Sequence, residues 1–151
     1  GRVAENFKLS TGTWVSVGPL RVDFVGKFDP LIKDAVVTGH DRDDIGMLVF
    51  PDEEQTRKLA PHLPPETPFE EVVTDQVVKD AFQERLAAIA RQSTGSSSRV
   101  TRIALMCEPP SIDLGEATDK GSLNQRAVLA NRAAHVEALY AAETRPNVIR
   151  L

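Results

Sequence analysis

Cysteine is almost absent from this chain, since Cys107 is the only one among 151 residues. A single thiol cannot form a disulfide within the chain, which excludes a small secreted domain held together by internal disulfides. Cys107 ends the apolar run RIALMC, so we expect its side chain to be buried and to stay reduced in a cytoplasmic protein.

An excess of basic residues and long apolar runs are also missing. The chain has 18 Lys and Arg against 22 Asp and Glu, and this formal net charge of −4 argues against a nucleic-acid partner. No apolar run approaches the roughly 20 residues that cross a bilayer, so we expect no membrane partner. The sequence contains no Gly-x-Ser-x-Gly element, which argues against a serine hydrolase.

The residues that are present suffice for a packed core, because 41% are hydrophobic and 26% are charged. The length suits one domain, and no internal repeat is visible. The chain starts at Gly1 rather than at a methionine, with the segment GRVAENFKLSTGTWV. This unusual start leads us to expect a part of a longer protein.

Periodicity and turn residues predict a two-layer α+β domain. We expect a hairpin within residues 1–17 that turns at Gly12, and a mostly antiparallel three-stranded sheet packed against helices. A helix after Pro19 would bury Leu20, Phe24 and Phe28. The strands are predicted at 35–37, 45–51 and 99–109, and a proline-rich loop at 61–68. Later helices are predicted at 75–92, with Thr74 as the cap, and at 122–142. The last nine residues are predicted to form a C-terminal tail.

Lys120 is the first candidate for chemistry, because it lies between an aspartate and a glycine in the predicted loop 110–122. A lysine ammonium is a compact charge that suits phosphate or carboxylate oxygens, and Gly121 would let the backbone approach a ligand. The alternative is an ordinary solvated lysine beside Glu116 and Asp119. The local sequence alone favours this alternative.

The opening segment is the second candidate. Arg2 and Lys8 flank a stretch that leads into the Gly12 turn, and two cations there would suit a phosphate group. An ordinary charged hairpin explains the same residues. His40 and the three aspartates in GHDRDDIG are residue types that bind metal ions, but a polar turn between two strands explains this stretch better.

Taken together, the two ends resemble the adenylate-forming enzyme superfamily, which includes acyl- and aryl-CoA synthetases. The start GRVAENFK and TGTWV is similar to the superfamily's hinge segment, and TDKGSLNQRAVL stands where its catalytic lysine loop precedes the last helix. The resemblance covers essentially the whole chain. The stretches AENFKLSTGTWVSVGPLR, GHDRDDIG and TDKGSLNQRAVLANR look closest to feruloyl-CoA synthetases, although the lysine loop departs from the commoner Pro-Lys-Thr-x-x-Gly-Lys form.

The resemblance implies a reaction in two steps that uses ATP, Mg²⁺ and coenzyme A. In the first step, Lys120 would reach the carboxylate and the α-phosphate during adenylation. Arg2 and Lys8 would contact the AMP portion. After a rotation of the domain, the Gly12 hairpin and Trp14 would line the channel for the pantetheine thiol. Mg²⁺ would ride on the ATP phosphates, held mainly by another domain.

The resemblance also implies where this domain belongs. It would be the mobile C-terminal lid over residues 1–151, with its own N-terminal domain as partner, a hinge at Ala4 or Glu5, and an aryl acid such as ferulate as substrate. By itself the lid should be inactive. Two alternatives stay open: a non-catalytic α+β binding or regulatory module, and an adenylating enzyme that loads a carrier protein.

Overall fold

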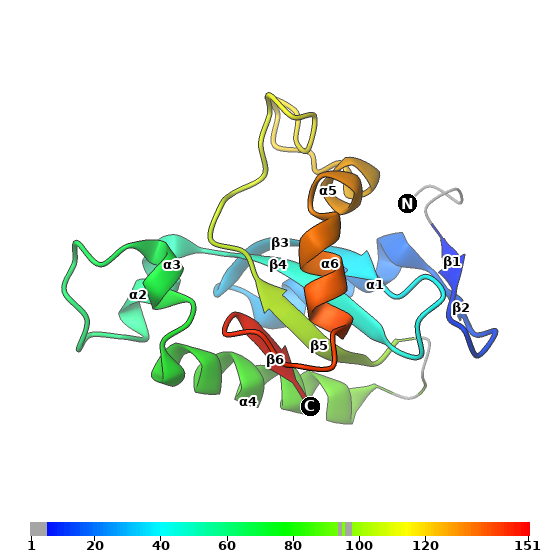
Figure 1. Cartoon of the computed structure of the whole chain (residues 1–151), viewed down its shortest axis with the longest axis horizontal. Coiled ribbons are helices and arrows are strands. Elements are labelled where there is room, and N and C mark those ends of the chain that lie inside the picture. The colour runs from blue at the N-terminus through cyan, green and yellow to red at the C-terminus, as the bar shows by residue number, and fades with distance from the viewer. Residues whose placement is uncertain (1–5, 94, 96–97) are drawn as a thin grey trace.

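The computed structural model describes residues 6–93, 95 and 98–151 (Figure 1). The predictions for Arg2, Ala4 and Glu5 therefore lie outside the described residues. The strands are β1 (Phe7–Lys8), β2 (Trp14–Val15), β3 (Ile32–Thr38), β4 (Ile45–Pro51), β5 (Val100–Leu105) and β6 (Val148–Arg150). The helices are α1 (Val17–Phe28), α2 (Glu53–Lys58), α3 (Phe69–Val72), α4 (Gln76–Gln92), α5 (Gln125–Asn131) and α6 (Ala133–Tyr140).

The main sheet has four strands among the described residues, in the order β3-β4-β5-β6. The outer pairs are antiparallel, whereas β4 and β5 run parallel because the chain crosses over through α4 between them. The α+β class is confirmed, but the prediction of three strands was one short. The supposed tail supplies β6, whose Val148 and Ile149 are buried against β5.

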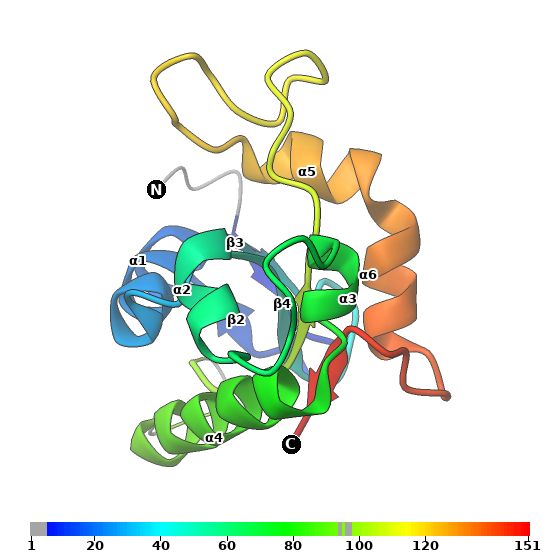
Figure 2. The same cartoon turned by 90° about the vertical axis from the view of Figure 1, so that its left-hand side faces the viewer.

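Helices cover both faces of this sheet, so the domain has more than the two predicted layers (Figure 2). Side chains alternate along β4: Met47 and Val49 join a core cluster with α1 and α4, while Leu48 and Phe50 join a second cluster with α5 and α6. A strand covered on both faces carries a continuous apolar sequence. This explains why the run IGMLVFP is buried throughout.

The two long helices lie where the apolar spacing predicted them. In α1 the buried side chains include Leu20, Phe24 and Phe28, and in α4 they include Val78, Phe82, Leu86 and Ile89. The rings of Phe28 and Phe82 stack with centroids 5.7 Å apart, which joins the two helices.

The predicted cap of α4 was wrong by one residue. The Asp75 carboxylate accepts hydrogen bonds from the backbone N–H groups of Val77 and Val78, at 3.1 and 3.4 Å. The Thr74 hydroxyl instead donates back to the carbonyl of Glu71.

The predicted helix 122–142 is two helices, α5 and α6, with a break at Arg132, whose φ of −111° and ψ of 32° leave the helical region. Figure 2 shows the two helices at a clear angle to each other. The short helices α2 and α3 flank the proline-rich loop and were not predicted. Cys107 is exposed, contrary to expectation, because it follows the end of β5.

Candidate functional site

Lys120 lies in a long loop that joins β5 to α5 and extends away from the sheet (yellow in Figures 1 and 2). A tight turn forms its end: the N–H of Gly121 donates to the carbonyl of Thr118 at 2.9 Å, and the N–H of Thr118 donates to Ser122 at 2.9 Å. Gly121 has a φ of +87°, a conformation that glycine adopts without strain. This turn presents Lys120 to solvent, and its ammonium enters no ion pair among the described residues.

Glu116, which the sequence analysis named only as a neighbour of a solvated Lys120, is buried to 1% exposure. Its carboxylate oxygens accept hydrogen bonds from Nε and Nη2 of Arg132, each at 3.0 Å. The N–H of Ser111 donates to the same carboxylate at 2.9 Å. The hydrogen bonds from Arg132 hold the pKa of Glu116 below its usual value, so the carboxylate stays ionised. No spacing in the sequence signals this pair.

The start of α5 is fixed to the sheet by a second residue that the sequence did not single out. Gln125 is buried, and its side-chain amide binds the backbone of Val37 in the edge strand β3. Its Nε2 donates to the Val37 carbonyl at 2.7 Å, and its Oε1 accepts from the Val37 N–H at 3.0 Å. The side-chain amide thus pairs with both backbone groups of Val37 at the edge of the sheet, as the backbone of a further strand would.

The N-terminal hairpin brings two of the predicted residues together. β1 and β2 are antiparallel, and Lys8 pairs directly with Trp14, which places both side chains on the same face. Gly12 lies in the turn with a φ of +89°, and its N–H donates to the carbonyl of Leu9 at 2.9 Å. Trp14 is 49% exposed. The hairpin therefore presents a cation and an aromatic ring side by side.

A groove of about 620 Å³ lies between this hairpin and α5. Lys8 and Trp14 line it from the hairpin, His40 from the turn before β4, and Arg126 from α5. Lys120 does not line this groove, so the structure separates the predicted adenylation lysine from the hairpin residues.

The turn 39–44 binds the hairpin through hydrogen bonds to Ser10. The Ser10 N–H donates to the carbonyl of Arg42 at 2.8 Å, and the Ser10 hydroxyl donates to Asp43 at 2.6 Å. His40 lies 3.3 Å from Asp41 on an exposed surface. In the part of the chain that the structure describes, no group of three or more His, Cys, Asp or Glu is placed to hold a metal ion. The aspartates of this turn instead serve hydrogen bonds and ion pairs.

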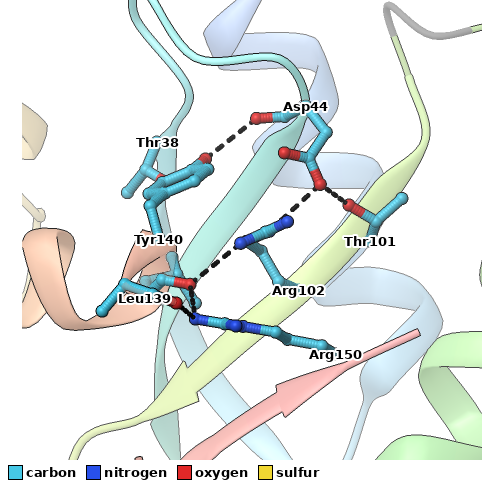
Figure 3. Close-up of polar contacts among 8 residues, drawn as sticks. Thr38, Asp44, Thr101, Arg102, Leu139, Tyr140 and Arg150 are labelled. Carbon is cyan, nitrogen blue, oxygen red and sulfur yellow. Dashed lines mark hydrogen bonds and ion pairs between the residues drawn. The ribbon is translucent and has the colours of Figure 1, made fainter. Parts of the chain in front are cut away.

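Asp44 leads from this turn into a polar network that fixes α6 to the sheet (Figure 3). Its carboxylate accepts from Nε of Arg102 at 3.0 Å and from the hydroxyl of Thr101. Nη1 of Arg102 and Nη2 of Arg150 both donate to the carbonyl of Leu139, at 3.1 and 3.0 Å. Two arginines thereby satisfy a carbonyl at the end of α6, where the helix leaves its last carbonyls without partners.

Tyr140 completes the network from the last residue of α6. Its hydroxyl donates to the backbone carbonyl of Asp44 at 2.9 Å and lies 3.0 Å from the hydroxyl of Thr38. The guanidinium groups of Arg42 and Arg102 lie 4.7 and 4.8 Å from the centre of its ring. Burial raises the pKa of this phenol to about 12.

The family described as "AMP-binding enzyme C-terminal domain" matches residues 7–144. The chain belongs to this family. A curated relative, the long-chain-fatty-acid–[acyl-carrier-protein] ligase AEE15, chloroplastic, of Arabidopsis thaliana, is 25% identical over 140 residues. The match takes in 93% of this chain and 17% of that protein, so the chain spans about a sixth of its relative's length.

Solved structures of adenylation domains share the fold. The A domain of carboxylic acid reductase from Segniliparus rugosus, in complex with AMP and a co-purified carboxylic acid, is 25% identical, with a TM-score of 0.69 over 92% of this chain and 20% of that one. The A-PCP didomain of the same enzyme, in complex with AMP, is also 25% identical, with a TM-score of 0.67 over 90% of this chain and 17% of that one. The adenylation domain of the carboxylate reductase from Mycobacterium chelonae is 23% identical, with a TM-score of 0.69 over 92% of this chain and 20% of that one, and at this identity it supports the fold alone.

These matches confirm the predicted fold and superfamily of this C-terminal domain. They do not single out feruloyl-CoA synthetases, since the relatives are a ligase for an acyl carrier protein and carboxylic acid reductases. No helix within the described ranges has the length and apolar character needed to cross a membrane.

Proposed function

We propose that this chain is the mobile C-terminal domain of an ATP-dependent acid–thiol ligase, in which Lys120 promotes adenylation. The observation that carries the proposal is an exposed ammonium that enters no ion pair with the described residues, at the end of a loop whose base is firmly held, in a member of the AMP-binding family. When a carboxylate oxygen attacks the α-phosphorus and pyrophosphate leaves, negative charge develops on the oxygens around phosphorus. A positioned ammonium stabilises that charge.

The hairpin groove is the proposed face for the second step, in which a thiol displaces AMP from the acyl-adenylate and forms a thioester. Trp14 and the Gly12 turn would line the path of a pantetheine arm, and Lys8 would approach the AMP phosphate. These roles are supported by the exposed ring of Trp14, which lies beside Lys8 along an open groove. Arg2 would contact the AMP portion, and the hinge would lie at Ala4 or Glu5.

For the acceptor and the acid we propose coenzyme A and an aryl acid such as ferulate, on the similarity of the quoted stretches to feruloyl-CoA synthetases. Loading of a carrier protein is a second candidate, because the Arabidopsis relative is a ligase for an acyl carrier protein and one solved relative is an A-PCP didomain. The two candidates share the first step and differ in the protein or nucleotide that carries the thiol.

The test uses the full-length enzyme and separates the two steps. Pyrophosphate release over a panel of aryl and fatty acids measures adenylation, and thioester formation from pre-made acyl-adenylate measures the second step. Lys120→Ala should lower adenylation by about 10²–10³-fold, the effect of removing one group that stabilises a developing oxyanion, and should spare the second step. Lys58→Ala, which removes another exposed lysine, is the matched control.

Equal losses of Lys120→Ala in both steps would contradict the role of Lys120. No loss in either step would favour a binding or regulatory module instead. Trp14→Ala should show the opposite pattern, with slow thioester formation and normal pyrophosphate release. Comparing coenzyme A with a phosphopantetheinylated carrier protein as acceptor then decides between the two candidates.

A further inference from the structure

The Lys120 loop lacks the apolar packing that ordinarily fixes a loop. Between Cys107 and Ser122, all of which the structure describes, Glu116 is the only buried residue. The loop's large apolar side chains, Ile112 and Leu114, are 59% and 65% exposed. Burial of apolar surface therefore contributes little to the order of this segment. Polar contacts order the loop instead: Nδ2 of Asn131 donates to the carbonyl of Leu114 at 3.1 Å, Ala117 bridges to Leu123, and the buried Glu116 makes the contacts described above.

Arg132 supplies those contacts and holds the loop at three points. Besides its two hydrogen bonds to Glu116, its Nη1 donates to the carbonyl of Glu108 and its Nη2 to the carbonyl of Pro109, both at 3.0 Å. Its guanidinium also lies 5.0 Å from the centre of the Phe50 ring in β4. An arginine suits this task because its planar fork offers several donors in fixed directions.

Glu116 in turn joins the two arms of the loop. Its backbone N–H donates to the carbonyl of Ser111 at 2.9 Å, and its carbonyl accepts from the N–H of Asn124, the cap of α5, at 2.7 Å. Lys120 lies four residues after Glu116, beyond this junction. The charged pair thus fixes the base on which the Lys120 turn stands.

We propose that Glu116 and Arg132 are positioning residues for Lys120, which set the place of its ammonium through their hold on the loop. This inference rests on the proposed function of Lys120 and adds two residues to that site. Displacing a reacting group by about 1 Å from afar costs on the order of 100-fold in rate. The loss should fall on the adenylation rate, because neither residue lines the hairpin groove.

The kinetic test compares Arg132→Met and Glu116→Gln with a matched control in the full-length enzyme. Arg57→Met is the control, because Arg57 also donates to loop carbonyls, of Pro65 and Thr67, and lies against the ring of Phe69. Both test variants should slow pyrophosphate release about 10–100-fold, with the KM for ATP and the thioester step unchanged. Arg57→Met should leave both steps unchanged.

A double variant shows whether the pair acts through Lys120. Once Lys120→Ala has removed the ammonium, adding Glu116→Gln should cause little further loss. Losses that multiply in the double variant, or equal losses in both steps, would overturn the proposal. Should Arg132→Met not fold, Arg132→Lys keeps a charge beside Glu116 while it loses the fork of donors.

Trypsin cleavage after Lys120 provides a readout that needs no activity. Arg132→Met should speed the cut between Lys120 and Gly121 in the native enzyme, while the cut after Lys58 keeps its rate. An unchanged cut after Lys120 would refute the ordering of the loop by this pair. If Lys120→Ala leaves adenylation intact, the proposed function and the catalytic part of this inference both fail, and the cleavage rate alone still decides whether the pair orders the loop.

Discussion

Gly46 offers a sharp test of how α6 is held on the sheet. It lies in β4, where it pairs with Thr38 on one side and Arg102 on the other. A Cβ atom at this position would stand 2.7 Å from Cδ2 of Leu139, 2.8 Å from Cγ of Arg102 and 3.0 Å from Oγ1 of Thr38. Carbon atoms in contact prefer separations of about 3.5–4.0 Å. Alanine at position 46 must therefore push its neighbours apart.

None of these neighbours is free to move. Arg102 is held by Asp44 and by the carbonyl of Leu139, the Leu139 side chain is fully buried, and the Thr38 hydroxyl lies 3.0 Å from that of Tyr140. Inserting a methyl group into a packed core usually costs about 1–3 kcal/mol. We expect the upper part of that range, about 2–3 kcal/mol. Since each kcal/mol lowers the Tm of a domain of this size by about 2–4 °C, Gly46→Ala should lower it by roughly 4–12 °C.

Gly26→Ala is the matched control for this experiment. Gly26 lies on the exposed side of α1, and apart from its chain neighbours and the backbone of its own helix no described atom stands within 4 Å of its added Cβ. Alanine there should stabilise the helix by about 0.5–1 kcal/mol. Thermal and urea unfolding of the two variants should thus shift in opposite directions. A Gly46→Ala variant as stable as the parent, or a shift of both variants in the same direction, would refute the packing argument.

Three further predictions concern single polar groups. Asp75→Ala should cost about 1 kcal/mol in urea unfolding, because it removes the cap of α4, whereas Thr74→Ala should change little. The pKa of Glu116 is lowered in the folded protein, so its stabilisation is fully present above the ordinary pKa of 4.5 and is lost as pH falls through the folded value. The stability gap between the parent and Glu116→Gln should therefore shrink in acid; a gap that stays constant would contradict the ion pair. Burial raises the pKa of Tyr140, the chain's only tyrosine, from 10.0 to about 12. Tyrosinate absorbance should therefore develop near pH 12 rather than near pH 10, and the protein should lose stability as the pH rises from 10 to 12. An absorbance midpoint at pH 10 would contradict the burial.

The sequence predicted the elements whose apolar residues repeat over several turns or fill a strand. Leu20, Phe24 and Phe28 recur every four residues and marked α1, and the run of 45–51 marked β4. β6 escaped because three residues are too few to show a period, and its pairing with β5 defines it. The break at Arg132 escaped because α5 and α6 continue the same apolar spacing across it.

The candidate site divides in the same way. Lys120 and the Gly12 hairpin were singled out from their local residues, and the resemblance to a known superfamily then gave them roles, whereas the pairing of Lys8 with Trp14 is seen only in the structure. The residues that hold the site in place were missed. Glu116 and Arg132 are 16 positions apart and belong to no repeating pattern, and a charged side chain is normally expected at the surface.

Helix α5 connects the two proposed faces and limits where the domain can bend. Gln125 binds its start to β3, Arg126 lines the hairpin groove, and Arg132 directly after its end holds the Lys120 loop. The loop and the groove are thus fixed to one helix, which is itself packed on the sheet. Bending between them would break buried hydrogen bonds, so both faces must move as one body. The proposed rotation, which would exchange the two faces at a shared active site, would then need a pivot outside this body, and the hinge at Ala4 or Glu5 stays our proposal for it.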